Sequence, residues 1–303
     1  MKNKIVDVKN MSVLFGDFVA VDNISFDVER GEIFGFLGAN GAGKTTTIRV
    51  LCGLLTPSSG QVTVDGMKLV PGYENRIKQI VGYMSQRFTL YNDLSVKENF
   101  DFAAALRGLK ADEYLNNRAQ LLDFIGFDRD LGVVVKDLPG GIKQEVALCV
   151  ALLHRPLIVF LDEPTAGVAP TSRLRFWQLI RVLAKSGVTI FVTTHYMDEA
   201  ENCSRIALMR DGRLIAIDSP ENLKVKTFGD SLYRLRAKRK NPTAPIPGIV
   251  DIWQPYGGSY HLKFKDGVAV NEYLKKMKSD WDIVQIKPSL EDVFIRLVEE
   301  NKK

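Results

Sequence analysis

The sequence predicts an α/β protein in which buried parallel strands carry functional loops at their carboxyl ends. Residues 33–37 and 157–161 are short, continuous apolar runs, as expected of strands buried on both faces of a sheet. A glycine-rich octet follows the first run at once, and two carboxylates follow the second. The chain has 303 residues and 46% hydrophobic content, which suits one large domain with a packed core and a smaller second domain.

Segments on either side of these runs predict antiparallel strands that flank the parallel core. Within residues 1–30, apolar side chains alternate with polar ones, as in strands with one buried face. The alternating residues are Ile24, Phe26 and Val28 on one face, with Ser25, Asp27 and Glu29 on the other. Residues 205–210 and 213–218 read as a hairpin, because Asp211-Gly212 is a typical two-residue turn between them.

The octet at residues 38–45 matches the phosphate-binding pattern G-x-x-x-x-G-K-[ST] at every fixed position. Glycines let the backbone point its N–H groups at phosphate oxygens, the following helix adds partial positive charge, and Lys44 adds a full one. The residues expected to contact a nucleotide here are Gly38, Ala39, Asn40, Gly41, Ala42, Gly43, Lys44, Thr45 and Thr46. Taken alone, the octet also fits an ordinary glycine-rich turn.

Asp162 and Glu163, at the end of the second apolar run, make nucleotide binding the better interpretation. Ligands of open α/β sheets bind at the carboxyl ends of the strands, so both carboxylates are expected beside the octet. Asp162 is the candidate to hold Mg²⁺ together with the Thr45 hydroxyl, and Glu163 the candidate to polarise an attacking water. A third strand, residues 188–194, ends at His195, which is expected to contact the γ-phosphate or to orient Glu163. The alternatives are a charged turn and a structural histidine.

Together these motifs make residues 4 to about 220 resemble the ATP-binding subunit of ABC transporters. The resemblance implies a P-loop NTPase cassette with a RecA-like parallel core, an antiparallel β subdomain and a helical subdomain at about residues 87–150. Residues 221–303 are then expected to form a small α+β accessory or regulatory domain. The resemblance is finer for drug-resistance exporters, because residues 194–201 and 288–294 are similar to segments of that subfamily.

Further site residues follow from the resemblance alone. Gln86 matches a glutamine that senses Mg²⁺ and the transmembrane partner, and it is a candidate metal and nucleotide contact. Gly140 and Gly141 match the segment that binds the γ-phosphate of ATP held by a second ATP-binding subunit. Phe15 is the best match to an aromatic residue that stacks on adenine, and Phe18 is a weaker one.

Two positions depart from the family pattern. Pro139 stands where the family has a serine, and it supplies neither a hydroxyl nor a backbone N–H, so up to two donors of about 1.5–3 kcal/mol each are lost. Ala169 replaces an aspartate that normally links the two nucleotide sites of the dimer. We expect hydrolysis that is retained but slow, or a composite site completed by a partner with a fuller signature. The alternative is a regulatory cassette that binds ATP with little or no turnover.

Composition agrees with a cassette that works beside a membrane. A net charge of +5 is modest and does not indicate a nucleic-acid partner. The chain has no apolar signal segment and no apolar run of the roughly 18 residues that a spanning helix needs. We therefore expect a cytoplasmic protein that is peripheral on the inner face of the cell membrane through transmembrane permease subunits. The three cysteines are expected to be free thiols.

Other interpretations fit less well. A soluble cassette acting on ribosomes or DNA would normally carry two cassettes, a coiled coil or a set of zinc-binding cysteines. A small-molecule kinase could share the octet, but its acceptor site would not explain Gly140-Gly141 or the Gln86 segment. In the last part of the chain, a basic run at residues 234–240 is interpreted as a solvated strand edge, with an anionic membrane surface or an acidic partner as alternatives.

Overall fold

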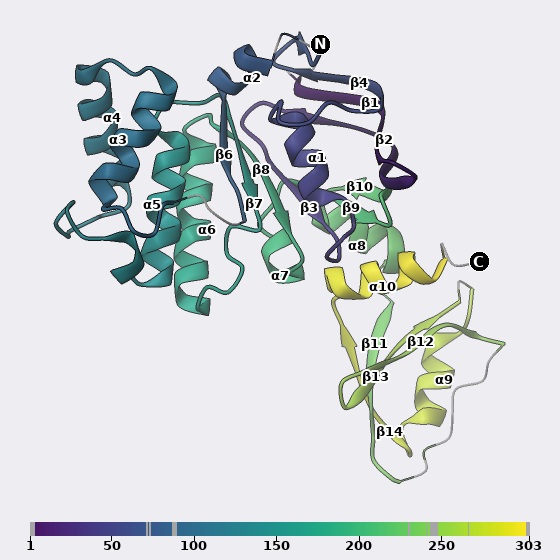
Figure 1. Ribbon diagram of the computed structural model, residues 1–303. Helices are drawn as coiled ribbons and strands as arrows, with labels where there is room; N and C mark the ends of the chain where they lie inside the picture. Colours follow the sequence, from purple (N-terminus) through teal and green to yellow (C-terminus); the bar gives the residue numbers. More distant parts are fainter. Residues whose placement is uncertain are drawn as a thin grey trace. The chain divides into compact units, whose positions relative to one another are not determined.

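The computed structural model describes residues 4–70, 72, 74–86, 90–229, 231–240, 242, 248–265 and 267–300 (Figure 1). The chain divides into two compact units, Met1–Ser219 and Pro220–Lys303, and each is described here by itself. What each unit does within the whole protein stays a prediction.

The first unit is built around a six-stranded sheet with the strand order β10-β9-β3-β8-β7-β6. Its strands are β3 (Ile33–Leu37), β6 (Val81–Met84), β7 (Ile158–Asp162), β8 (Thr189–Thr194), β9 (Arg205–Arg210) and β10 (Arg213–Asp218). All neighbouring pairs are parallel except the β9–β10 hairpin at the edge. Every residue of β3, β7 and β8 is buried, as the continuous apolar runs at residues 33–37 and 157–161 predict for β3 and β7.

A second, antiparallel sheet of the same unit has the order β2-β1-β4-β5. It consists of β1 (Lys4–Phe15), β2 (Phe18–Glu29), β4 (Ser59–Val64) and β5 (Met67–Lys68). The predicted strand with Ile24, Phe26 and Val28 facing inward is β2, and all three side chains are buried. The predicted α/β fold with a parallel core and an antiparallel β part is therefore confirmed.

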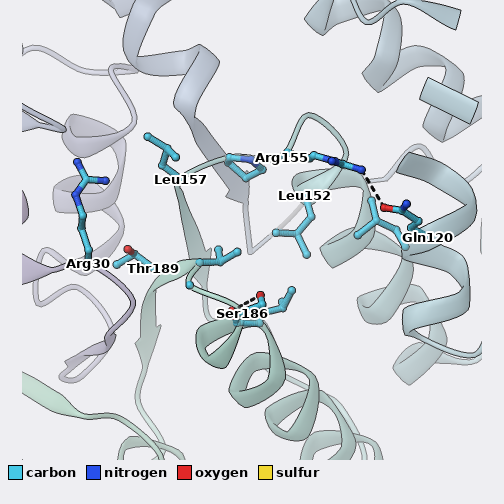
Figure 2. Close-up of a pocket in the computed structure, with 12 residues that line it drawn as sticks. Arg30, Gln120, Leu152, Arg155, Leu157, Ser186 and Thr189 are labelled. Carbon is cyan, nitrogen blue, oxygen red and sulfur yellow. Dashed lines mark hydrogen bonds between the residues drawn. The ribbon is translucent and has the colours of Figure 1, made fainter. Parts of the chain in front are cut away.

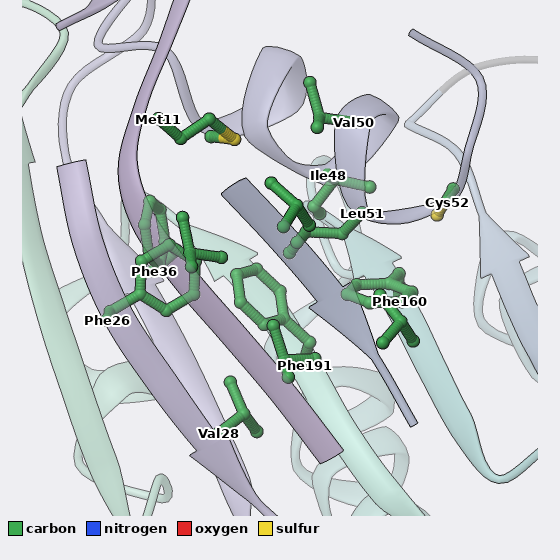
Figure 3. Close-up of a cluster of buried hydrophobic side chains, with 14 of the residues drawn as sticks. Met11, Phe26, Val28, Phe36, Ile48, Val50, Leu51, Cys52, Phe160 and Phe191 are labelled. Atoms are coloured by element: carbon green, nitrogen blue, oxygen red, sulfur yellow. The ribbon is translucent and has the colours of Figure 1, made fainter. Parts of the chain in front are cut away.

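One hydrophobic core joins the two sheets to α1 (Lys44–Leu51), which contributes Ile48, Val50 and Leu51 (Figure 3). Phe191 is at the centre of this core. Its ring centroid lies 5.2–6.2 Å from those of Phe26, Phe34, Phe36 and Phe160. Aromatic pairs at such separations stabilise the fold beyond the burial of their apolar surface, so these strands are held firmly against one another.

The remaining helices of the first unit are α2 (Glu74–Ile80), α3 (Val96–Arg107), α4 (Ala111–Phe124), the 3₁₀ turn η1 (Val135–Asp137), α5 (Gly140–Leu152), α6 (Pro170–Lys185) and the short α7 (Met197–Ala200). Of these, α3, α4, α5 and α6 lie on the β6 side of the sheet in Figure 1, whereas α2 and α7 lie near its upper and lower ends. Helices α3 and α5 share a separate core that includes Phe100, Val146 and Leu153. These helices match the predicted helical stretch, of which residues 87–89 lie outside the described residues.

Among its described residues, the second unit contains a four-stranded antiparallel sheet with three helices. Its elements are α8 (Pro220–Phe228), β11 (Leu232–Ala237), β12 (Val250–Tyr256), β13 (Ser259–Phe264), α9 (Val270–Met277), β14 (Trp281–Ile286) and α10 (Leu290–Glu300). The strand order is β12-β13-β11-β14, and Leu235, Leu262, Phe264 and Trp281 form its core. This is the predicted α+β arrangement.

Within the predicted basic run, two of the cations have partners inside the second unit. Arg239 pairs with Asp280 at 2.5 Å, and Lys238 donates to the carbonyl of Lys278 at 2.9 Å. Arg234 and Arg236 are exposed on β11, which is an inner strand of its sheet rather than an edge strand. The interpretation of the run as a strand edge is therefore wrong in this respect.

The three cysteines are buried and free, as predicted. Burial raises the pKa of each thiol, for Cys52 well above its ordinary value. Among the residues that the structure describes, none of the helices combines the length and the apolar character needed to span a membrane.

Replacing Phe191 by alanine tests the central role of this side chain in the core. We expect the free energy of unfolding to fall by about 3–5 kcal/mol, because the substitution removes a ring that contacts residues of both sheets and leaves a cavity in its place. Chemical denaturation measures this change. Leu174→Ala in α6 is the control, since Leu174 is 67% exposed and its loss should cost less than about 0.5 kcal/mol. Equal losses in the two variants would contradict this account of the core.

His154 predicts a pH dependence of stability. Burial, helped by the nearby Arg107 charge, lowers the pKa of His154 from 6.5 to about 4, and its Nε2 lies 3.0 Å from the Val81 carbonyl oxygen. As the pH falls, His154 binds a proton at a higher pH in the unfolded chain than in the folded chain. The free energy of unfolding therefore drops between pH 6.5 and 4. Denaturation between pH 7 and 5 should show this slope, and His154→Gln should flatten it. An unchanged slope in that variant would assign the dependence to other groups.

Candidate functional site

The glycine-rich octet forms the turn between β3 and α1, and its backbone conformation requires glycine. Gly41 and Gly43 have φ values of 82° and 103°, a region that favours glycine. A Cβ on Gly43 would lie 2.6 Å from the Ala20 carbonyl oxygen, and one on Gly38 would lie 2.2 Å from that of Met209. These close approaches require glycine at both positions, and a glycine-rich loop before a helix can point backbone N–H groups at a phosphate.

Lys44, the first residue of α1, is folded back over this turn. Its side chain is only 4% exposed, and Nζ donates to the carbonyl oxygens of Gly38 at 2.8 Å and Ala39 at 3.1 Å. The same nitrogen lies 3.1 Å from Glu163 Oε1. The loop therefore holds a buried positive charge whose carboxylate partner comes from another strand.

Asp162 ends β7 and faces the start of α1. Thr45 Oγ1 donates to Asp162 Oδ1 at 3.1 Å, and Thr193 Oγ1 donates to the same oxygen at 2.7 Å. The second oxygen, Oδ2, is buried and has no hydrogen-bond partner among the described residues. Buried carboxylate oxygens are normally paired, so this one fits a carboxylate that binds Mg²⁺ or a water of its coordination shell. The predicted pair of Thr45 and Asp162 thus fits a magnesium ion.

Glu163 is the point where the predicted residues converge. Gln86 Nε2 donates to Glu163 Oε2 at 3.1 Å, and His195 Nδ1 lies 3.1 Å from the same oxygen, while Lys44 lies beside Oε1. Glu163 has a φ of 48°, an uncommon conformation for a residue other than glycine, and Thr193 accepts its backbone N–H. Such backbone strain is frequent at functional sites, where surrounding contacts fix it.

The segment with Gly140 and Gly141 begins α5, and Pro139 is its N-cap residue. Space around the Cα of Gly140 is open, whereas a Cβ on Gly141 would lie 2.5 Å from Ser172 Oγ of α6. The structure therefore requires glycine at 141 for packing within this chain. Among the described contacts, none joins either glycine to Glu163.

Phe15 and Phe18 face each other across the turn between β1 and β2. They are 50% and 65% exposed, so neither is a core residue. Exposure leaves both rings available for stacking, and the choice of Phe15 as the adenine contact stays a prediction.

Sequence reasoning missed several polar residues around Glu163. Thr193, which holds both Asp162 and Glu163, and Thr194 are buried at the end of β8. Thr165 and Glu199 are buried beside them, Arg173 forms an ion pair with Glu199, and the Arg173 guanidinium lies over the Tyr196 ring. Two adjacent threonines at the carboxyl end of a strand, after the apolar residues 190–192, were the available signal for Thr193 and Thr194.

A cavity of about 610 Å³ lies at the amino-terminal ends of the parallel strands, away from the residues described above (Figure 2). Leu157 and Thr189, at the amino-terminal ends of β7 and β8, line it together with Arg30, Arg155 and Leu183. It contains none of the predicted site residues. Because ligands of such sheets bind at the carboxyl ends of the strands, this cavity is no candidate for the nucleotide.

Residues 21–166 match the family described as ABC transporter. The Nod factor export ATP-binding protein I of Burkholderia thailandensis is 33% identical over 297 residues, which cover 96% of this chain and 96% of that protein. The chain belongs to the ABC transporter family. The predicted resemblance to ATP-binding subunits of this family is confirmed.

Other members of the family agree. The probable multidrug ABC transporter ATP-binding protein YbhF of Escherichia coli is 44% identical over 226 residues, which cover 75% of this chain but only 39% of YbhF. The linearmycin resistance ATP-binding protein LnrL of Bacillus subtilis is 35% identical, covering 76% of this chain and 74% of that protein. CbiO1 of Clostridium perfringens, described as part of the ABC transporter complex cbiONQ, has a similar structure, with a TM-score of 0.68 at 27% identity over 74% of this chain and 92% of that chain.

In this ABC cassette, the site combines a cation, an acid and two groups that orient the acid. Lys44 can neutralise phosphate charge, Asp162 and Thr45 can hold Mg²⁺, and Glu163 can accept a hydrogen bond from water. Glu163 is 7% exposed on its side chain, whereas His195 is 32% exposed. The acid is therefore shielded, and the histidine lies where a ligand can reach it.

Thr193→Val tests the role of the threonine that sequence reasoning missed. The variant loses one hydrogen bond to Asp162 and one from the Glu163 amide, so Mg²⁺-dependent affinity for ADP should fall about 2- to 10-fold. Calorimetric titration with and without Mg²⁺ measures this.

Thr189→Val is the matched control, because it places the same substitution at the other end of β8, where Thr189 accepts the Gly31 amide. That variant should lose stability but bind Mg·ADP normally. If Thr193→Val also bound Mg·ADP normally, Thr193 would have only a structural role.

Proposed function

We propose that this chain binds and hydrolyses ATP, with Mg²⁺, as the energy-supplying subunit of an exporter of the multidrug type. The observation that carries the proposal is the convergence of Lys44, Gln86 and His195 on the Glu163 carboxylate. The direction of transport is supported by the names of the relatives, which concern multidrug transport, Nod factor export and linearmycin resistance.

For hydrolysis, we infer that Glu163 orients a water molecule or accepts its proton. Gln86 and His195 hold the carboxylate from one side, and His195 also contacts the γ-phosphate. Lys44 lies beside the other carboxylate oxygen and stabilises negative charge on the transferring group. Mg²⁺, held by Thr45 and Asp162 with Gln86 nearby, would supply additional positive charge to the phosphates.

We further propose that two ATP-binding subunits close around ATP, with Gly140 and Gly141 of one contacting the γ-phosphate bound to the other. Helix α5 begins at Gly140, so its first N–H groups have no acceptor within the helix and are suited to an anion. Pro139 precedes the first helical residue, where its missing N–H does not break the helix. The lost hydroxyl still predicts slow turnover.

The alternative is a regulatory cassette with little or no hydrolysis, which Pro139 and Ala169 favour. Ala169 is the N-cap of α6 and supplies no side-chain hydrogen bond there. Against this alternative, Glu163 and His195 are both present and paired at 3.1 Å. Partners are proposed to be permease subunits that hold the chain at the cytoplasmic face of the membrane, with residues 1–220 as the ATP-binding domain and 221–303 as a regulatory domain.

Two substitutions test the proposal on the purified chain. Lys44→Ala should weaken Mg·ATP binding by about 10-fold or more, because a charge-assisted contact is lost. Glu163→Gln should bind Mg·ATP but hydrolyse it about 10²- to 10⁴-fold more slowly. Steady-state phosphate release and calorimetric titration give the two readouts.

Lys185→Ala is the control, since Lys185 is exposed at the end of α6 and should affect neither quantity. Release of phosphate should be measured with and without the membrane partner. ATP binding without turnover in both cases would favour the regulatory alternative, and unaltered ATP affinity in Lys44→Ala would refute the proposed site.

A further inference from the structure

A second carboxylate, that of Glu199 in α7, is buried close to the proposed catalytic residues. Glu199 is 1% exposed, in contrast to its neighbour Asp198, whose side chain is 72% exposed. A buried carboxylate is costly unless it is fully paired, so its partners indicate what it holds in place.

Three partners from three segments surround this carboxylate. Thr165 Oγ1 donates to Glu199 Oε1 in a short hydrogen bond, and Thr194 Oγ1 donates to Oε2 at 2.7 Å. Arg173 Nε lies 3.3 Å from Oε1, an ion pair without hydrogen-bond geometry. Both oxygens are thus engaged, and each threonine hydroxyl has an acceptor inside the protein.

The positions of these partners in the sequence give the network its significance. Thr165 lies two residues after Glu163, and Thr194 directly precedes His195. Glu199 therefore joins the loop that follows the proposed water-activating acid to the strand end that carries the histidine. Because Glu163 Oε2 and His195 Nδ1 are 3.1 Å apart, a small shift of either segment would separate them.

Arg173 extends the network to the segment that contains Ala169. Its backbone N–H donates to the Ala169 carbonyl at 2.9 Å, and its guanidinium carbon lies 4.2 Å from the Tyr196 ring centroid. Tyr196 in turn donates its backbone N–H to Thr194 Oγ1 at 3.0 Å, and its ring lies 4.1 Å from that of His195. The residues on both sides of His195 are thus fixed through Glu199.

We propose that Glu199 is a positioning residue that aligns His195 with Glu163 for the hydrolysis step. This inference rests on the proposed function. Glu199 touches neither reacting group and acts through the Thr165 and Thr194 hydroxyls. A merely structural carboxylate would stabilise the fold without affecting the relative placement of Glu163 and His195.

Glu199→Gln keeps the shape of the side chain but replaces one acceptor oxygen by a donor and removes the charge opposite Arg173. We expect kcat for ATP hydrolysis to fall about 10-fold or more, as is typical when an outer partner of a site is lost, with KM changed less than about 2-fold. Glu201→Gln is the matched control, because Glu201 is exposed two residues later. Thr165→Val, which removes a single arm of the network, should give a smaller loss of kcat.

The imidazole NMR resonance of His195, one of three histidines in the chain, is a readout that needs no turnover. The chemical shift of this resonance should change in Glu199→Gln and stay the same in Glu201→Gln. Thermal denaturation checks that both variants are folded. If Glu199→Gln does not fold, the same two measurements on Thr165→Val decide the inference.

Equal kcat values in the wild type and Glu199→Gln would overturn the inference. So would an unmoved His195 resonance accompanied by a parallel loss of stability and nucleotide affinity, which is the signature of a structural role. If the wild type itself releases no phosphate, the proposed function fails, and the His195 resonance still decides whether Glu199 places this histidine.

Discussion

The Glu163 carboxylate and its three partners depend on one constraint, which is that neighbouring parallel strands end at the same edge of a sheet. Lys44 follows β3, Gln86 follows β6 and His195 follows β8, and these strands surround β7 in the order β3-β8-β7-β6. The pairing places Leu37 beside Thr194 and Asp162 beside Thr193. Residues that are up to 151 positions apart in sequence, from Lys44 to His195, therefore meet within hydrogen-bond distance of one carboxylate.

The hydrophobic core of the first unit keeps the strands paired in this register. A slip of one residue would turn each side chain of a strand to the other face, and the rings around Phe191 leave no space for it. The charged groups of the site are tolerated in a buried place only because they pair with one another, as Lys44 does with Glu163. Core packing and polar pairing thus support the same arrangement.

Local pattern was enough to predict the strands, the octet and the acidic pair. Lys44, Asp162 and Glu163 stand at fixed distances from apolar runs, and their chemistry can be read from a few adjacent residues. Gln86 needed the resemblance to a family, because a single glutamine after a strand has many structural explanations. His195 was predicted from its place at a strand end beside the octet and the acidic pair, since a histidine alone would have been as well explained by a structural role. The assignment of residues 234–240 to a strand edge failed because strand order in a sheet is set by distant pairing, which no local pattern encodes.

The missed residues share a different physical cause. Thr193, Thr165 and Glu199 are ordinary in sequence and gain their importance only from partners on other segments. Gly141 shows the same effect. Its contact with ATP of a second subunit stays a prediction, and only the structure shows that Ser172 of the same chain also leaves no room for a side chain there. Tertiary contacts of this kind become visible only when the segments are placed in space.

The burial of all three cysteines has a practical consequence for studying motion in this ATPase family member. Their thiols are shielded and reluctant to ionise, so alkylating dyes and spin labels will react with them slowly. A cysteine introduced at an exposed site, such as the hairpin tip at Phe18, would react in preference to them. A label attached there could then be followed in the wild-type background without first removing the native thiols.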